Sequence, residues 1–162
     1  MLTAWNKLKF SKLGVLAKVL SMSMSNLPMD NIVYGDVDPL NQFIRVFPPT
    51  SMSSDTNISK DTKYPVVFLI HGGFWRDKWN IDNSFLINTV PCFTSKGYAV
   101  CALEYRRCGQ NNHGGYPETL NDYIAGYNKL YDLSHEKVYN YLDINRITLV
   151  GHSVGGHACL YL

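Results

Sequence analysis

Short runs of apolar residues alternate along the chain with longer segments in which apolar positions recur at helical spacing. Residues 64–70, 98–103 and 147–150 form three such runs, and each is too uniformly apolar for a strand with one face in water. These runs therefore predict strands buried within a sheet that is covered on both faces. An earlier run, residues 41–47, alternates enough to predict another strand, with which residues 32–34 can pair.

The segments between these runs predict helices. Residues 80–96 have a helical pattern with a break at Pro91, which we place in the first turn of the second piece. The next helix, residues 119–131, places apolar side chains three or four positions apart, at Leu120, Ile124, Tyr127 and Tyr131. A further helical piece is expected over residues 134–142. Strands separated by helices favour right-handed crossovers, so the expected fold class is α/β, with a mostly parallel sheet and flanking helices.

The last strand run breaks into Gly-x-Ser-x-Gly at residues 151–155, which has the form of a nucleophile elbow. A serine hydroxyl is a poor nucleophile unless a base can reach it, so this chemistry places the serine on a sharp turn between strand and helix. Gly151 and Gly155 allow the close approach that such a turn requires. The pattern predicts Ser153 as a nucleophile at the start of a helix.

A second glycine turn, His71-Gly72-Gly73-Phe74, follows the strand that is expected to lie beside the strand of Ser153. Acyl transfer requires N–H donors that are already aimed at the oxygen that becomes negative. The N–H groups of Gly73 and Phe74 could converge with that of Val154 above Ser153. The order and spacing of the two motifs favour this role over that of a plain glycine turn.

Composition and charge narrow the function classes. The chain has 162 residues, 46% of them apolar, which is enough for one domain with a real core. The formal net charge is +2, but four lysines precede the first acidic residue, so no basic nucleic-acid footprint remains in the rest of the chain. The four cysteines show neither a C-x-x-C pair nor a metal-binding spacing, and Cys101 and Cys159 are expected to be buried thiols in a reducing compartment.

Residues 1–30 are expected to be an N-terminal extension, poorly ordered or helical, before a domain that covers residues 31–162. The apolar run at 13–20 is short and contains Lys18, so it fits neither a membrane span nor a secretory signal. A mitochondrial presequence fits the lack of acidic residues but not the lack of arginine. A variable extension or an imperfect translation start is the favoured interpretation, with a cytoplasmic location. The sequence indicates no oligomeric state.

Four segments together resemble the α/β-hydrolase fold. They are His-Gly-Gly-Phe-Trp-Arg (71–76), Glu-Tyr-Arg-Arg (104–107), Gly-Gly-Tyr-Pro-Glu-Thr-Leu-Asn-Asp (114–122) and the stretch from Asp143 to His157. Within that fold they are similar to hormone-sensitive-lipase-like esterases and, more narrowly, to kynurenine formamidases (arylformamidases), whose signature is His-Gly-Gly-x-Trp. The similarity covers about residues 31–162, which would supply roughly the first five of the eight strands of a whole domain.

The resemblance implies a serine hydrolase that cleaves a carboxylic ester or an aryl formamide through an acyl-enzyme, without metal or organic cofactor. Ser153 matches the nucleophile, and the oxyanion hole is matched by Gly72, Gly73, Phe74 and Val154. Phe74 stands where formamidases usually have tyrosine, and Val154 stands where alanine is common. The expected partner is a small-molecule ester or formamide, with no nucleic acid and no membrane span.

The family's triad runs serine, acid, histidine along the chain, yet only nine residues follow Ser153. The triad acid and base are therefore expected to be absent from this chain. His157 lies four residues after Ser153 on the helix, so it is interpreted as a packing or capping residue. His152 is expected to rest against neighbouring loops, and His71 to support the oxyanion turn. The remaining histidines, His113 and His135, are expected at the surface.

Other polar and aromatic groups have both structural and functional interpretations. Glu104, Arg106 and Arg107 leave a strand beside the site, where a structural ion pair is favoured over substrate binding. Four aromatic residues could form the wall of an acyl or aryl pocket, although core and loop packing would place the same types there: Trp75, Trp79, Tyr105 and Tyr116.

A non-catalytic relative that binds a small molecule or a partner protein is the alternative function class. The presence of both glycine motifs favours the enzyme. Sequence beyond Leu162 would discriminate the two, since a strand that ends in Asp or Glu and a later loop histidine would support the enzyme.

The fold resemblance places residues 147–150 at an apolar sheet edge in this chain, and such edges aggregate. We therefore predict that the 162-residue polypeptide, a fragment of the whole domain by this interpretation, is poorly soluble and lacks hydrolase activity when expressed alone. Solubility and hydrolysis of a short aryl ester are the measurements. Hydrolysis by the purified chain that is lost in Ser153→Ala would contradict the prediction.

Overall fold

The computed structural model describes residues 29–54, 62–109 and 113–162. Most of the expected N-terminal extension, residues 1–28, lies outside the described residues. So do parts of the two loops that the sequence predicts before residue 64 and after residue 108.

A five-stranded sheet forms the centre of the molecule, with the strand order β1-β2-β4-β3-β5. The strands are β1 (Asp30–Val33), β2 (Phe43–Phe47), β3 (Tyr64–Ile70), β4 (Ala99–Glu104) and β5 (Leu142–Gly151). Each strand predicted from an apolar or alternating run is present. β5 pairs only with β3, so the strand that leads to Ser153 is an edge of the described sheet, as expected.

The sheet is mixed, and its parallel part surrounds the candidate site. β3 pairs in parallel with β4 and with β5, whereas β1 pairs antiparallel with β2, and β2 with β4. β1 and β2 run antiparallel because a short turn, without a helix, connects them. Strand carboxyl ends meet at the same edge where β3 and β5 run in parallel, which places the two glycine motifs side by side.

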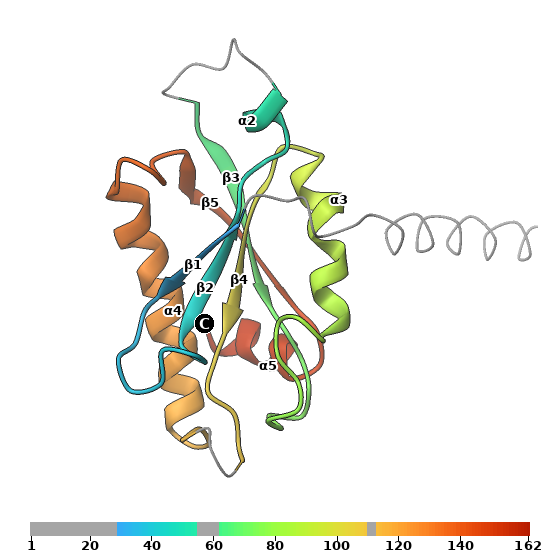
Figure 1. Ribbon diagram of the computed structural model, residues 1–162, viewed down its shortest axis with the longest axis vertical. Helices are drawn as coiled ribbons and strands as arrows, with labels where there is room; N and C mark the ends of the chain where they lie inside the picture. The colour runs from blue at the N-terminus through green and yellow to red at the C-terminus, as the bar shows by residue number, and fades with distance from the viewer. Residues whose placement is uncertain (1–28, 55–61, 110–112) are drawn as a thin grey trace, which may run out of the picture.

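Helices cover both faces of the sheet, with α4 and α3 on opposite sides in Figure 1. The helices are α2 (Ser51–Ser54), the 3₁₀-helix η2 (Phe85–Thr89), α3 (Val90–Thr94), α4 (Glu118–His135) and α5 (Val154–Tyr161). Pro91 lies in the first turn of α3, as predicted, because its missing N–H is not needed there. The segment before it forms turns and η2 where the sequence predicts a regular helix.

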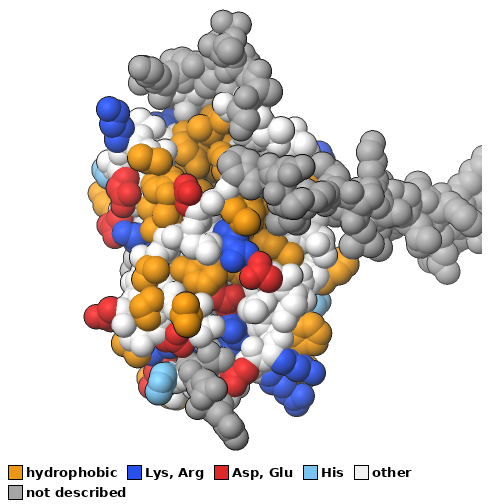
Figure 2. All heavy atoms as spheres, viewed as in Figure 1, with side chains coloured by type: hydrophobic (Ala, Val, Ile, Leu, Met, Phe, Trp, Pro, Cys, Tyr) orange, Lys and Arg blue, Asp and Glu red, His pale blue; other side chains and the backbone are white. Residues whose placement is uncertain are grey.

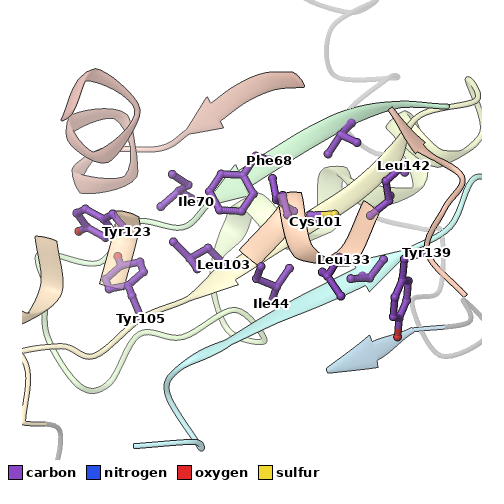
Figure 3. Packing of buried hydrophobic residues seen from close by; sticks show 14 of the residues in the cluster. Ile44, Phe68, Ile70, Cys101, Leu103, Tyr105, Tyr123, Leu133, Tyr139 and Leu142 are labelled. Carbon is purple, nitrogen blue, oxygen red and sulfur yellow. The ribbon is translucent and has the colours of Figure 1, made fainter. Parts of the chain in front are cut away.

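The core consists of two clusters, one on each face of the sheet. Phe68, Ile70 and Leu103 point toward α4, while Val67 and Leu69 point toward η2 and α3. Figure 3 shows the α4 side, where the rings of Tyr105 and Tyr123 lie next to each other at one end of the cluster. Both faces of β3 and β4 are dry, which agrees with the uniformly apolar runs that predict these two strands. The run at 147–150 is not buried as predicted, since Ile147, Leu149 and Val150 are half-buried and Thr148 is exposed at the sheet edge.

The buried face of α4 agrees with the predicted one in part, since Leu120 and Tyr127 pack against the core cluster as predicted. Ile124 and Tyr131 are exposed, whereas Asp122, Tyr123 and Gly126 are buried. A hydrophobicity pattern misses this face because it carries a carboxylate and a glycine. The glycine is required, since a Cβ at Gly126 would lie 2.3 Å from Leu103 Cδ1.

The helical piece predicted over residues 134–142 is wrong. α4 ends at His135, whose Nδ1 lies 2.8 Å from the Tyr131 carbonyl oxygen, and Glu136 is extended. The chain then turns so that Tyr139 and Tyr141 are buried in the core cluster. β5 consequently begins at Leu142, five residues earlier than predicted, with a register shift opposite Pro65. Proline has no N–H to donate to the ladder, which explains the irregularity at this position.

On the face shown in Figure 2, Lys and Arg side chains are interspersed with Asp and Glu, and hydrophobic side chains lie between them. Among the described residues, no helix combines the length and the apolar character that crossing a bilayer would require.

A buried carboxylate connects β2, β4 and α4. Asp122 accepts hydrogen bonds from the backbone N–H of Arg106 at 2.9 Å, from its guanidinium at 2.8 and 2.9 Å, and from Gln42 Nε2 at 2.8 Å. This is the structural ion pair that the sequence favours for Arg106. The carboxylate is fully paired, so its burial fixes the start of α4 relative to the end of β4.

We expect Asp122→Ala to lower the free energy of unfolding by about 3–5 kcal/mol, because it leaves the buried guanidinium of Arg106 without its partner. Urea unfolding at low protein concentration, followed by tryptophan fluorescence, measures the loss. Asp132→Ala is the matched control on the same helix, since Asp132 is exposed and its loss should change stability by less than about 0.5 kcal/mol. Equal effects of the two substitutions would contradict the structural role of Asp122.

Candidate active site

Ser153 lies on the sharp turn between β5 and α5. The strand ends at Gly151 and the helix begins at Val154, with Ser153 at φ 54° and ψ −117°. Few residues with a side chain adopt this region, and such strain is concentrated at functional sites. Ser153 is exposed, so its side chain is accessible above the sheet, where the sequence predicts it.

Close backbone approach explains the two glycines of the motif. A Cβ on Gly155 would lie 2.0 Å from the Ile70 carbonyl oxygen, and one on Gly151 would lie 2.1 Å from the Gly155 carbonyl oxygen. Neither distance is sterically possible for a side-chain carbon. The first turn of α5 therefore rests directly on the end of β3 and on the end of β5.

The chain leaves β3 through His71 and Gly72 into a turn with unusual dihedral angles. Three consecutive residues have positive φ: Gly73 at 130°, Phe74 at 57° and Trp75 at 56°. The turn reaches Ser153, because an ideal Cβ on Gly72 would lie 3.2 Å from Ser153 Cβ. The structure thus brings together the two motifs that are some eighty residues apart in the sequence.

A cavity of about 310 Å³ opens at this junction. Ser153 and the turn of Gly72, Gly73 and Phe74 form one side of it. The rest of the lining is Trp79, Ser84, Phe85 and His152. Ser84 and Phe85 were not predicted as lining residues from the sequence. The sequence indicates only that they lie in the segment before Pro91, which covers the sheet.

Backbone donors are available beside Ser153. The N–H groups of Gly73 and Phe74 donate to no acceptor among the described residues. Val154 is the first residue of α5, so its N–H has no intrahelical acceptor. These are the three N–H groups that the sequence predicts for an oxyanion hole, and an anionic oxygen near a helix N-terminus is also favoured by the helix dipole.

His71 supports the glycine turn from below. Its Nδ1 lies 2.8 Å from the Gly72 carbonyl oxygen, its Nε2 lies 3.1 Å from Glu104 Oε1, and its ring stacks on Tyr105 at 4.5 Å. Burial, together with the smaller effect of the positive charge of Arg107, lowers the pKa of His71 to about 4, although the hydrogen bond to Gly72 raises it. The Gly72 carbonyl and the Glu104 carboxylate both only accept, so the neutral ring, which carries one proton, can donate to only one of them at a time. This arrangement is that of a structural support, as predicted, and not of a proton carrier.

Glu104 connects the glycine turn to two other segments. It pairs with Arg107, and its Oε2 accepts a hydrogen bond of 2.8 Å from the backbone N–H of Ile81. Arg107 also donates to the Asn41 side chain at 2.8 Å. Glu104 and Arg107 are both buried. They therefore form the structural ion pair favoured from the sequence.

No described histidine hydrogen-bonds to the hydroxyl of Ser153. His152 lies over the glycine turn, with Nδ1 2.9 Å from the ideal Cβ position of Gly72. His157 contacts Trp75 edge to face, at 5.8 Å between ring centroids, which agrees with a packing role. The other two, His113 and His135, are exposed, as predicted.

The four aromatic residues considered as pocket walls lie in three different places, namely two cavities and the core. Trp79 lines the cavity of Ser153, while Trp75 and Tyr116 line a second cavity between α4 and α5. Tyr105 is fully buried in the core, where its hydroxyl donates to the His71 carbonyl oxygen at 2.9 Å. Core packing is therefore the correct interpretation for Tyr105, and Trp75 also packs against the core cluster.

Cysteines and carboxylates form no evident metal site in the described part of the chain, where no three His, Cys, Asp or Glu residues are grouped as ligands. All four cysteines are free thiols. Cys101 is fully buried, and burial raises its pKa to about 12. Cys159, expected to be buried, is half-buried.

A sequence model of the BD-FAE family matches residues 55–162, which is two thirds of the chain and includes both glycine motifs. A comparison with curated protein sequences gives no significant match.

Solved structures with a similar fold include several esterases. Esterase B of Lactobacillus rhamnosis (HN001) is 23% identical, with a TM-score of 0.61, over 95% of this chain and 46% of its own. A bifunctional GH43-CE protein of Bacteroides eggerthii is 24% identical, with a TM-score of 0.61, over 80% of this chain and 15% of its own. The thermophilic esterase Est2 of Thermogutta terrifontis is 17% identical, with a TM-score of 0.59, over 87% and 46%.

The chain therefore spans less than half the length of each of these structures. At this level of identity the similarity shows the fold. It confirms the partial α/β-hydrolase fold expected from the sequence.

The buried position of His71 predicts a pH dependence of stability. Folding lowers the pKa of His71 from 6.5 to about 4. The contribution of the neutral, buried His71 to the free energy of unfolding is therefore fully present above pH 6.5 and is lost as the pH falls toward 4. The loss should reach about 3 kcal/mol, because the unfolded chain binds a proton that the folded chain excludes. Urea unfolding between pH 7 and pH 4 measures it.

The free energy of unfolding of His71→Asn should fall less over this pH range than that of the unmodified chain. His135→Asn, at an exposed position, should show the same dependence of unfolding free energy on pH as the unmodified chain. A pH profile of His71→Asn that runs parallel to that of the unmodified chain would contradict the assignment.

Proposed function

The chain belongs to the BD-FAE family, and on that premise we propose that it supplies the nucleophile and the oxyanion hole of a serine hydrolase that cleaves carboxylic esters. The observation that carries the proposal is the position of Ser153. It lies in a strained turn at a helix N-terminus, beside a second turn whose N–H groups at Gly73 and Phe74 have no acceptor in the described structure.

In the proposed reaction, the Ser153 oxygen attacks the ester carbonyl carbon. The carbonyl oxygen becomes negative and accepts hydrogen bonds from the N–H groups of Gly73, Phe74 and Val154. Collapse of the tetrahedral intermediate breaks the bond to the alkoxide, which leaves with a proton as the alcohol, and an acyl group remains on Ser153. Water then attacks the acyl group and releases the acid.

Preorganisation is what the described residues contribute to this reaction. The N–H groups are fixed before the substrate arrives, since His71, Tyr105 and Glu104 hold the glycine turn from the core side. Fixed donors do not need to reorganise as charge develops, which is the main source of their catalytic effect. The reaction also requires a base for the proton of Ser153, and none of the described histidines bonds to its hydroxyl.

The lining of the cavity beside Ser153 favours a substrate whose acyl or alcohol group is uncharged. Phe74, Trp79 and Phe85 supply aromatic surface, and the cavity of about 310 Å³ has the size of a small ligand site. A narrower form of the proposal is cleavage of an aryl formamide, which rests on the similarity of residues 71–76 to kynurenine formamidases. Relative rates on N-formylkynurenine and p-nitrophenyl acetate would distinguish the narrower form from a general esterase.

A thiol at position 153 tests the site without requiring the base, because a cysteine becomes a thiolate near its own pKa of about 8.5. We expect the Ser153→Cys variant to be acetylated at this position by p-nitrophenyl acetate at pH 8.5, at least about tenfold faster than a thiol without oxyanion donors. Release of p-nitrophenolate gives the rate, and peptide mass spectrometry locates the acetyl group.

Two matched controls place the same thiol elsewhere. Ser84→Cys introduces it into another wall of the same cavity, and Ser95→Cys introduces it at an exposed position. The acetylation rate of the unmodified chain, which has four cysteines of its own, is subtracted as the background. Equal acetylation rates at positions 153, 84 and 95 would contradict the proposal and favour a non-catalytic binding protein.

A further inference from the structure

The turn that carries the N–H groups of Gly73 and Phe74 has a backbone conformation that its side chains do not favour. The Arg76 N–H donates to the Gly73 carbonyl oxygen at 3.0 Å, and both central residues, Phe74 and Trp75, have positive φ. Turns with positive φ at both central positions ordinarily take Gly, Asn or Asp there, because a larger side chain is strained. Two bulky aromatic residues keep this conformation only where their surroundings fix it.

Two tyrosines hold this turn at its two ends. At the start of the turn, the Tyr105 hydroxyl donates to the His71 carbonyl oxygen at 2.9 Å. At its end, the hydroxyl of Tyr123 on α4 accepts a hydrogen bond of 3.0 Å from Trp75 Nε1. The rings of the two tyrosines meet edge to face, with 5.0 Å between their centroids, and lie next to each other in Figure 3. The oxyanion donors therefore lie between two anchors that belong to one packed pair.

The anchor at Trp75 depends on a single hydroxyl group. Tyr123 is fully buried, and a phenylalanine would fill the same space, so the hydroxyl serves the hydrogen bond and not the packing. The N–H of Cys108 donates to the Trp75 carbonyl oxygen at 2.7 Å, and the ring of His157 contacts the indole edge to face. Neither contact supplies an acceptor for the indole N–H, which has no other acceptor among the described residues.

The Tyr123 hydroxyl keeps its proton at the pH at which a thiol or a serine reacts with an ester. Burial raises the pKa of Tyr123 to about 12, against the opposing effect of the hydrogen bond from Trp75. The interaction with Trp75 therefore stays the same between pH 7 and pH 10, so it does not itself alter a pH–rate profile of the site in this range.

We propose that Tyr123 is a positioning residue of the oxyanion hole. Its hydroxyl acts through Trp75 to fix the turn, so that the N–H groups of Gly73 and Phe74 stay aimed at a carbonyl oxygen bound beside Ser153. This inference rests on the proposed function, because it concerns the same oxyanion donors. It assigns to α4 a role in catalysis, although no residue of α4 is among the described residues that line the cavity of Ser153.

Acetylation of the thiol in Ser153→Cys by p-nitrophenyl acetate measures the alignment of these donors. Adding Tyr123→Phe should slow the reaction of the thiolate at least about fivefold, toward the rate of Ser95→Cys, because a small misplacement of positioned groups costs much of their effect. Rates measured between pH 7 and pH 10 separate the rate constant of the thiolate from a change in the thiol pKa.

Tyr139→Phe, added to Ser153→Cys, is the matched control. Tyr139 is buried in the same core cluster, at the end away from Tyr123 in Figure 3, and its hydroxyl donates to Asp30 Oδ2 at 3.1 Å. This substitution also removes one tyrosine hydroxyl from the core, but it should leave the acetylation rate unchanged.

A double-mutant cycle tests whether Tyr123 acts through the indole. Trp75→Phe removes the other partner of the same hydrogen bond, so it should also slow the acetylation. Tyr123→Phe in the Trp75→Phe background should cause no further slowing, since the hydrogen bond is then already absent. Additive effects of the two substitutions would overturn the proposal.

An unchanged thiolate rate in Tyr123→Phe would overturn it as well. So would equal slowing by Tyr123→Phe and Tyr139→Phe, which would indicate a general loosening of the core.

The amide ¹H–¹⁵N signals of Gly73 and Phe74 separate this inference from the hydrolase proposal. If Ser153→Cys reacts no faster than Ser95→Cys, the hydrolase proposal fails. Amide signals that move in Tyr123→Phe but not in Tyr139→Phe would still support the positioning of the turn by Tyr123, and signals that do not move would overturn it.

Discussion

Direct backbone contact between the end of β3 and the first turn of α5 determines the geometry of the whole site. Gly155 rests on the Ile70 carbonyl oxygen, at a distance that admits no side chain. The contact brings the helix that carries Ser153 onto the strand that leads into Gly72. It sets the strained dihedral angles of Ser153 and places the turn after β3 beside it. Phe74 lines the cavity of Ser153, and the next residue, Trp75, lines a second cavity between α4 and α5.

The strain in that segment is balanced by interactions beneath it. Phe74 and Trp75 have positive φ angles, each of which costs about 1–3 kcal/mol where the residue carries a side chain. Trp75 is fixed by its hydrogen bond to Tyr123, and His71 by Gly72, Glu104 and the ring of Tyr105. These partners belong to the sheet core and to α4. The N–H donors beside Ser153 are thus held by the most buried part of the molecule, which is the condition for electrostatic preorganisation.

Much of this arrangement could be predicted from the sequence, and the exceptions have physical causes. The strand 64–70 and the two glycine motifs were predictable because uniform apolarity and glycine spacing are local signals. The complete buried face of α4 was not, since Asp122 and Gly126 are buried through partners distant in the sequence, Arg106 and Leu103. The turn after His135 was also missed, because Tyr139 and Tyr141 are buried by tertiary packing that helical spacing does not reveal. Within the site, Phe85 and Ser84 were missed because they reach Ser153 only through the path of the chain over the sheet.

We expect the turn at residues 72–74 to polarise a carbonyl group attached at position 153. Isotope-edited infrared spectroscopy tests it most directly, on a ¹³C-labelled acetyl group carried by the thiol of the Ser153→Cys variant. The carbonyl stretch should lie at lower frequency than that of the same thioester on the Ser95→Cys variant, since fixed N–H donors weaken the carbonyl bond more than water does. The same frequency at both positions would contradict it.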